Sequence, residues 1–163
     1  AAWYYTGGSR PYGYAGLGEL FVFVFFGLVA TLGTMATMTP LTGAGWAGAC
    51  GMGAIASALL VVNNLRDIPS DAAVGKRTLA VRLGDRNTRA FYVLLIAGSI
   101  AAALVAAHWK PWSLLALLAA PLIVGPARRV WGTLAGRDLV PILGATGRFQ
   151  IVYAVLLAYG LAR

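Results

Sequence analysis

Long apolar runs are the feature that most limits how this chain can fold. Residues 17–38 contain one charged side chain, Glu19, and about 22 such residues are enough to cross the hydrocarbon core of a bilayer as a helix. Further apolar segments follow at 45–65, 88–107, 113–131 and 144–161. Because backbone polar groups must be satisfied within lipid, the sequence predicts an all-α fold, a polytopic transmembrane bundle of about five helices. Pro121 and Pro126 predict a kink in the fourth.

The charged residues lie near the ends of these segments. Five crossings place the loops 1–16, 66–87 and 132–143 on one side, and eleven of the thirteen Lys and Arg residues lie on or near them. Only Lys110 and Arg163 lie on the other side. Since cytoplasmic loops carry an excess of bases, we expect these loops to face the cytoplasm in a multi-pass cell-membrane protein. The net charge of +8 therefore indicates topology, and we expect no nucleic-acid partner.

The second apolar segment carries a stripe of small residues. Gly45, Ala49, Gly53 and Ser57 recur at every fourth position. Small side chains at this spacing let a neighbouring helix backbone approach closely. The stripe therefore predicts a tight helix–helix contact.

A polar stretch follows directly after this segment. Asn63, Asp67 and Asp71 recur every four residues, so on one continuous helix their oxygen atoms would share a face, with about 40° of drift per step. Mg²⁺ is commonly held by one or two carboxylates, while water and substrate phosphates complete its shell. Lys76 and Arg77 come next, and such bases bind phosphate. The stretch predicts a site for a diphosphate and its metal ion.

Two other residues bear on the shape of this site. Because proline lacks an N–H and crowds the preceding turn, we expect the membrane helix to end near Asp67 and a short second helix to begin at Pro69, with Asp71 in its first turn. Glu19, at the start of the first apolar segment, either stabilises a helix N-terminus or faces the polar cavity.

The residues alone leave other interpretations of the polar stretch open. It can be a cytoplasmic loop that is basic for topology and carries two solvated acids. It can belong to a transporter segment with Asp67 and Asp71 as a cation site, although such acids usually lie near the bilayer midplane on interrupted helices. A noncatalytic membrane scaffold would require no particular carboxylate spacing.

The motif Asn63-Asn64-x-Arg66-Asp67-x-x-x-Asp71, with Gly75-Lys76-Arg77-Thr78-Leu79-Ala80-Val81-x-Leu83-Gly84 after it, resembles the second aspartate-rich motif of the UbiA superfamily of membrane prenyltransferases. It is most similar to the 1,4-dihydroxy-2-naphthoate prenyltransferases of menaquinone biosynthesis. Tyr5-Thr6-Gly7-Gly8 and Gly16-Leu17-Gly18-Glu19 are similar to the preceding loop and helix of that branch. Members have two aspartate-rich motifs, and this sequence contains only the second. The resemblance implies that residues 1–163 are the C-terminal part of one prenyltransferase domain, inactive without the N-terminal half.

The resemblance also implies a reaction and roles for individual residues. The expected enzyme uses Mg²⁺ to transfer a polyprenyl group from an allylic polyprenyl diphosphate to an aromatic acceptor. In this branch the acceptor is 1,4-dihydroxy-2-naphthoate, which loses CO₂ to give demethylmenaquinol; relatives use 4-hydroxybenzoate, homogentisate or tetrapyrroles. Asp67 and Asp71 would be the catalytic, magnesium-binding residues. Asn63, Asn64, Arg66, Lys76 and Arg77 would bind diphosphate, and Tyr5, Arg10 and Glu19 are weaker candidates for substrate contacts. Phe21 to Phe26 and the small-residue helix would line the prenyl tunnel.

Overall fold

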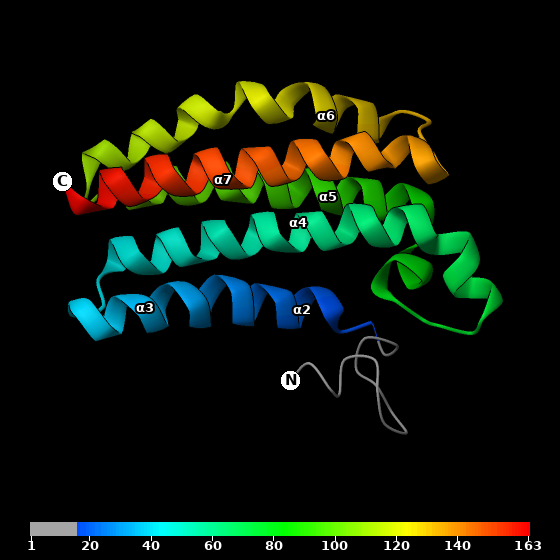
Figure 1. The fold of residues 1–163 in the computed structure, drawn as a ribbon, viewed down its shortest axis with the longest axis horizontal. Coiled ribbons are helices and arrows are strands. Elements are labelled where there is room, and N and C mark those ends of the chain that lie inside the picture. The colour runs from blue at the N-terminus through cyan, green and yellow to red at the C-terminus, as the bar shows by residue number, and fades with distance from the viewer. Residues whose placement is uncertain (1–15) are drawn as a thin grey trace.

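The computed structural model describes residues 16–163, which form helices joined by short connections (Figure 1). In chain order the elements are α2 (Gly18–Val22), the π-helix η2 (Phe23–Val29), α3 (Ala30–Met38), α4 (Gly43–Ala73), α5 (Leu79–Ala106), the 3₁₀-helix η3 (Pro111–Ala119), α6 (Pro121–Trp131), the 3₁₀-helix η4 (Gly136–Leu139) and α7 (Val140–Ala162). The all-α prediction is confirmed for this part of the chain. Within it, four helices are long and apolar enough to cross a membrane, or five if η3 and α6 form one bent span.

Helix α4 lies in the middle of the bundle. Figure 1 shows α2 and α3 along one side of α4, with α5 and α7 along the other. The largest buried side chains, Tyr92 on α5 and Phe149 and Tyr153 on α7, belong to the same apolar core as Ile55 and Val62 of α4. The most apolar stretch of α4 is 61% buried, against 11% for the Gly18–Met38 segment. Helix α4 therefore forms the centre, and the first membrane segment lies at the periphery.

The two predicted connections that the structure describes, 66–87 and 132–143, lie at the same end of the bundle, to the right in Figure 1, and α2 begins at this end too. Their boundaries differ from the prediction. Helix α4 continues to Ala73, and α5 begins at Leu79, so most of the predicted loop 66–87 is helical. The helix α5 is interrupted by a kink at Gly84, whose φ of 75° and ψ of 172° are not helical. The helices extend past the apolar segments because polar side chains satisfy their ends: Thr78 Oγ1 accepts a hydrogen bond from the Val81 N–H at 3.3 Å.

The predicted helix break at Pro69 is wrong, because α4 runs through this residue. A proline inside a helix removes one backbone hydrogen bond and crowds the carbonyl four residues earlier. Here Pro69 is exposed, and the turn beyond it is still bonded: Ser70 Oγ donates to the Asp67 carbonyl at 2.9 Å, and the Val74 N–H donates to the Ser70 carbonyl at 3.3 Å. One turn before Pro69, Leu65 is packed in the core, which holds this end of the helix in place.

The small-residue stripe of α4 is confirmed as the contact surface for the first membrane segment. A Cβ atom on Gly53 would lie 2.9 Å from the ring of Phe23, and one on Gly27 would lie 2.7 Å from the backbone nitrogen of Gly53. Ser57 Oγ donates to the backbone carbonyl of Glu19 at 3.0 Å. The two backbones therefore meet more closely than any larger residue would allow.

The first membrane segment contains the π-helical stretch Phe23–Val29, which the sequence did not predict. In a continuous α-helix, Glu19 and Met35 would point about 160° apart, since each residue turns by about 100°. A π-helix bonds each residue to the fifth along and takes more residues per turn, so it cancels much of this rotation. As a result both side chains face α4: Glu19 meets Asn64, and Met35 packs against Gly45.

The predicted kink in the fourth segment is confirmed at Pro121. This residue begins α6, and η3 and α6 meet there at an angle of 53°. The second proline, Pro126, lies inside α6 without ending the helix. The bend follows from the hydrogen bond and the space that Pro121 removes from the preceding turn.

Arg89 ties α5 to the end of α6. Its side chain is bonded to both carboxylate oxygens of Asp85, with Nε to Oδ1 at 2.6 Å and Nη2 to Oδ2 at 2.8 Å. The same guanidinium donates to the carbonyls of Val130 at 2.6 Å and Leu134 at 2.7 Å. Arg89 thus satisfies the Val130 carbonyl at the end of α6 and the Leu134 carbonyl in the connection that follows, and it fixes that connection to α5.

Replacing Arg89 with Ala is expected to lower the free energy of unfolding by about 2–3 kcal/mol, because buried carbonyls lose a charged donor. Unfolding of the purified protein in detergent micelles, followed by circular dichroism, measures this. Arg86→Ala is the matched control, since Arg86 has the same charge and is exposed on the same helix, and it should change stability by less than about 0.5 kcal/mol. Equal losses in the two variants would contradict the role given to Arg89.

Candidate active site

The end of α4 turns the chain back on itself. Gly75 has a φ of +73°, and its N–H donates to the Ala72 carbonyl at 3.2 Å, while the Lys76 N–H donates to the Asp71 carbonyl at 2.9 Å. These two bonds form a Schellman motif, which ends a helix with a glycine in the left-handed conformation. The turn places Lys76 beside the last turn of α4.

Asp71 and Lys76 form an ion pair across this turn. Lys76 Nζ lies 3.1 Å from Oδ1 and 3.0 Å from Oδ2 of Asp71. The Asp71 side chain is only 11% exposed. The structure therefore brings a predicted acid and a predicted base together in a place sheltered from solvent.

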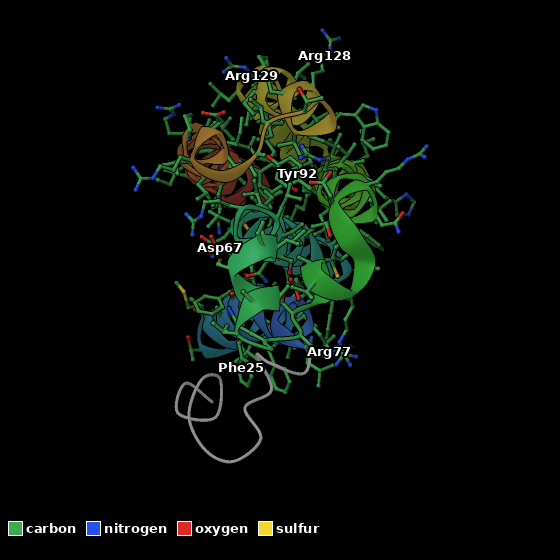
Figure 2. All side chains as sticks on the ribbon, turned by 90° about the vertical axis from the view of Figure 1, so that its right-hand side faces the viewer. Phe25, Asp67, Arg77, Tyr92, Arg128 and Arg129 are labelled. Carbon is green, nitrogen blue, oxygen red and sulfur yellow. The ribbon has the colours of Figure 1, made fainter. Side chains whose placement is uncertain are left out.

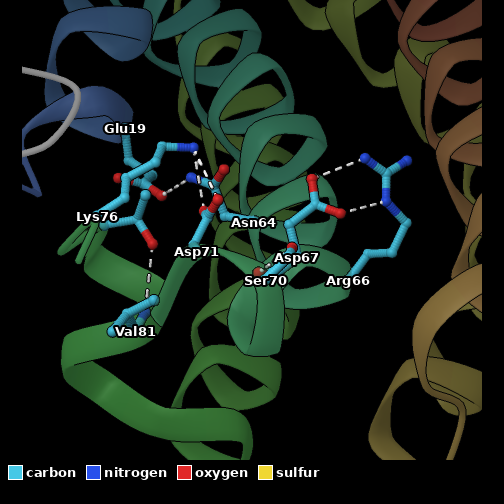
Figure 3. Close-up of polar contacts among 9 residues, drawn as sticks. Glu19, Asn64, Arg66, Asp67, Ser70, Asp71, Lys76 and Val81 are labelled. Atoms are coloured by element: carbon cyan, nitrogen blue, oxygen red, sulfur yellow. Dashed lines mark hydrogen bonds and ion pairs between the residues drawn. The ribbon is translucent and has the colours of Figure 1, made fainter. Parts of the chain in front are cut away.

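Glu19 joins this pair from α2. Its Oε1 accepts a hydrogen bond from Asn64 Nδ2 at 2.9 Å, and its Oε2, although buried, has no hydrogen-bond partner among the described residues. Figure 3 shows Glu19, Asn64, Asp71 and Lys76 together on one side of α4, and we call these four residues the rim cluster. Of the two roles expected for Glu19, the structure supports the one in which it faces a polar site.

The predicted shared face of Asn63, Asp67 and Asp71 is wrong in two respects. Asn64 accompanies Asp71 instead of Asn63, because residues seven apart are separated by only about 20° around a helix, whereas residues eight apart differ by about 80°. Asp67 points away from the rim cluster and pairs with Arg66, with Nε to Oδ1 and Nη2 to Oδ2 both at 2.7 Å (Figure 3). The two carboxylates thus have different basic partners.

Asn63 lines an apolar groove of about 380 Å³. The groove lies between the first membrane segment, α4 and α7, and its walls are Val22, Phe26, Ala56, Leu59, Leu60, Asn63 and Gln150. Val22 and Phe26 belong to the stretch predicted to line a tunnel. Gln150 was not predicted, and the available signal was an uncharged polar residue inside an apolar segment. Asn63 and Asn64 are consecutive on α4 and point about 100° apart, so the groove and the rim cluster lie on adjacent faces of this helix.

The remaining predicted site residues contribute less to this geometry. Arg77 is exposed, and its backbone carbonyl accepts a hydrogen bond from Arg82 Nε at 3.2 Å. Figure 2, which looks at this end of the bundle, shows Arg77 pointing outward and Arg128 and Arg129 on α6. The predicted contacts from Tyr5 and Arg10 lie outside the described residues.

The donor set fits part of a magnesium shell. Asp67, Asp71 and Asn64 supply carboxylate and amide oxygens, the ligand types that Mg²⁺ prefers, and this ion usually takes its other ligands from water and phosphate. In residues 16–163, however, no group of three or more His, Cys, Asp or Glu side chains could hold a metal ion. The described residues therefore provide some of the ligands that such a site would need.

This chain is a membrane helix bundle with acids and bases at one end and an apolar groove on an adjacent face, an arrangement able to accommodate a molecule with a charged head and a hydrocarbon chain. The model of the UbiA prenyltransferase family matches residues 1–138, and the chain belongs to this family.

Several curated relatives are similar over nearly the whole chain. It is 50% identical to the 1,4-dihydroxy-2-naphthoate octaprenyltransferase of Mycobacterium tuberculosis, over 99% of this chain and 56% of the relative. It is 40% identical to the protein of the same name from Escherichia coli, over 99% of this chain and 54% of the relative. The chain thus spans about half the length of the curated relatives it matches. No solved structure matches it.

Proposed function

We propose that this chain is the C-terminal part of a magnesium-dependent membrane enzyme that transfers a polyprenyl group from an allylic polyprenyl diphosphate to 1,4-dihydroxy-2-naphthoate. The acceptor loses its carboxylate as CO₂, and the product is demethylmenaquinol, a menaquinone precursor. The observation that carries the proposal is the rim cluster, with Glu19, Asn64 and Asp71 buried, near an apolar groove in a chain whose relatives are named 1,4-dihydroxy-2-naphthoate octaprenyltransferases. The basic end of the bundle would face the cytoplasm, in the cell membrane.

The shape of a polyprenyl diphosphate matches the division between groove and rim. The hydrocarbon chain would lie in the groove against apolar side chains such as Val22 and Leu59. The diphosphate would lie at the charged end, where Arg66, Lys76 and Arg77 supply positive charge and hydrogen-bond donors. The amides of Asn63 and Asn64, at the junction, would contact the first phosphate.

Asp71 would hold Mg²⁺ at the rim cluster, and the Asp67 side chain, which points toward Arg66 in this structure, would turn toward Asp71 to share the ion. Their ion pairs with Arg66 and Lys76 involve side chains that are 28–30% exposed, except for Asp71 at 11%. An exposed pair such as Arg66–Asp67 contributes only about 0–1 kcal/mol, so Asp67 can exchange its basic partner for a cation. At the more sheltered Asp71, the bound cation would take the place of the positive charge of Lys76. When bound, Mg²⁺ neutralises charge on the departing diphosphate. Arg66 and Lys76, once released, would turn to the phosphate oxygens.

The surroundings of the groove would favour the chemical step. The allylic C–O bond breaks with its electron pair leaving on diphosphate, and the positive charge is shared along the allylic carbons. The ring of Phe26, at the groove wall, offers a π face to that charge. The ring carbon that bears the acceptor's carboxylate forms the new C–C bond, and CO₂ leaves. Apolar walls limit attack by water on the allylic cation.

The 163-residue chain alone is expected to transfer no prenyl group, because it lacks the first aspartate-rich motif and so part of the proposed metal site. Purified in detergent with Mg²⁺, radiolabelled polyprenyl diphosphate and 1,4-dihydroxy-2-naphthoate, it should give no demethylmenaquinol. The complete enzyme that contains it should turn over in the same assay. Turnover by the chain alone at the rate of a full-length relative would refute the proposed division of the site, and absence of turnover by the complete enzyme would refute the proposed reaction.

A further inference from the structure

Oε2 of Glu19 is a buried carboxylate oxygen with no hydrogen-bond partner among residues 16–163. Glu19 is only 4% exposed, so bulk water does not reach this oxygen to act as its hydrogen-bond donor. Buried polar atoms are hydrogen-bonded in the large majority of cases, and an exception at a candidate active site calls for a ligand or a structural explanation. This oxygen belongs to the rim cluster (Figure 3).

Glu19 is held firmly from the side of α4. Ser57 Oγ donates to its backbone carbonyl at 3.0 Å, and Asn64 Nδ2 donates to Oε1 at 2.9 Å. Both partners are themselves buried, at 2% and 5% exposure. The position of Oε2 is therefore set by the contact between α2 and α4, as expected for a preorganised binding atom.

We propose that Glu19 Oε2 accepts a hydrogen bond from a phenolic hydroxyl of the aromatic acceptor, an inference that rests on the proposed function. Of the two substrates only the acceptor can satisfy this atom. A polyprenyl diphosphate offers an apolar chain and anionic oxygens. The carboxylate is repelled by the anionic oxygens, and placing it against the apolar chain would leave its charge without a partner. A hydroxylated aromatic offers O–H donors, and an O–H···O⁻ bond is of the strong, charge-assisted kind.

A metal ion is the other ligand that a carboxylate oxygen commonly takes, and the surroundings disfavour it here. The described residues contain no group of three or more side chains able to hold a metal. The proposed function already places Mg²⁺ at Asp71 of the same cluster, and the charge of that ion would repel a second cation beside Glu19.

The hydrogen bond would do two things in the reaction. It would orient the acceptor ring at the junction between the rim cluster and the groove. In the proposed binding mode, the allylic carbon of the prenyl donor lies at this junction. It would also draw the hydroxyl proton toward Glu19, which raises the electron density of the ring and makes its carbon a better nucleophile. Glu19 is thereby a specificity residue for hydroxylated aromatics.

The test uses Glu19→Gln in the complete enzyme. Glutamine keeps an oxygen for Asn64 but replaces Oε2 with an amide nitrogen, which cannot accept a hydrogen bond. The KM for 1,4-dihydroxy-2-naphthoate should rise about ten- to hundredfold, as for loss of a hydrogen bond to a charged group, while the KM for polyprenyl diphosphate changes less than about twofold. The wild-type enzyme should bind naphthoate inhibitors that lack one hydroxyl more weakly than it binds the acceptor, and the variant should lose this preference.

Asp138→Asn is the matched control, because it removes one exposed carboxylate from the same end of the chain, and it should leave both KM values unchanged. Equal increases in the two KM values, a raised Mg²⁺ requirement with an unchanged acceptor KM, or no change at all would overturn the assignment to the acceptor. If Glu19→Gln fails to fold, Glu19→Asp, which withdraws the oxygens by one methylene, carries the same prediction. Failure of the wild-type enzyme to prenylate any hydroxylated aromatic would refute the proposed function itself, a result distinct from an unaffected variant.

Discussion

Asp71→Asn in the complete enzyme is expected to lower kcat/KM for prenyl transfer by about 10²–10³-fold, the range found when one preorganised electrostatic group is removed from a reacting centre. The substitution removes one of the two carboxylates proposed to hold Mg²⁺ but keeps the shape of the side chain and an oxygen near Lys76. The fold should therefore persist. Steady-state assays over a range of Mg²⁺ concentrations test this, and the variant should need more Mg²⁺ for half of its own maximal rate.

Asp85→Asn separates loss of chemistry from loss of charge in this experiment. Asp85 is also a carboxylate at the charged end, but it pairs with Arg89 and lies outside the rim cluster. Its replacement should lower stability while leaving kcat per folded molecule unchanged. If Asp71→Asn retained wild-type kcat/KM at every Mg²⁺ concentration, Asp71 would be only the partner of Lys76 at the end of α4.

Gly27→Leu is expected to lower the free energy of unfolding by about 3 kcal/mol or more, the upper part of the range for overpacked contacts. Even a Cβ atom at this position would lie 2.7 Å from the backbone nitrogen of Gly53 and 2.9 Å from the carbonyl oxygen of Ala49. These are backbone atoms, which cannot rotate aside as a flexible side chain would. The first membrane segment would have to separate from α4, and unfolding in detergent micelles would show the loss.

Gly33→Leu is the control for this substitution. Gly33 lies in α3 on the same membrane segment, and a Cβ built on it meets nothing within 4 Å. The leucine should change stability by less than about 1 kcal/mol, since leucine is also a better helix former than glycine. Comparable destabilisation by the two substitutions would mean that the close contact at Gly27 is not what joins the segments.

The membrane segments could be predicted because each depends on a local property of the sequence. An apolar run of sufficient length specifies a helix in lipid wherever its neighbours lie, and Pro121 marks the bend in the fourth segment correctly. Pro69 was misjudged because its effect depends on surroundings. It is exposed near the end of α4, where one missing hydrogen bond is tolerated while the buried side of the helix stays packed.

The candidate site was only partly predictable, because its contacts join residues at different separations along the sequence. Asp71 and Lys76 are five residues apart, and the glycine between them marks the turn that joins them. Glu19 and Asn64 are 45 residues apart in sequence, and their bond depends on how α2 packs against α4. Helical spacing counted from Asn63 suggested the wrong amide, because a drift of about 40° per step accumulates over two steps.

Because of the π-helical stretch Phe23–Val29, the packing of the first membrane segment depends more on how many residues the stretch contains than on which residues they are. Apolar side chains on its outer surface can be exchanged for one another, whereas loss or gain of a single residue would rotate Glu19 by about 100° relative to Met35. The carboxylate would then leave Asn64 while every side chain stayed chemically the same. We expect related sequences to vary freely in composition over 23–29 and to keep the same length there.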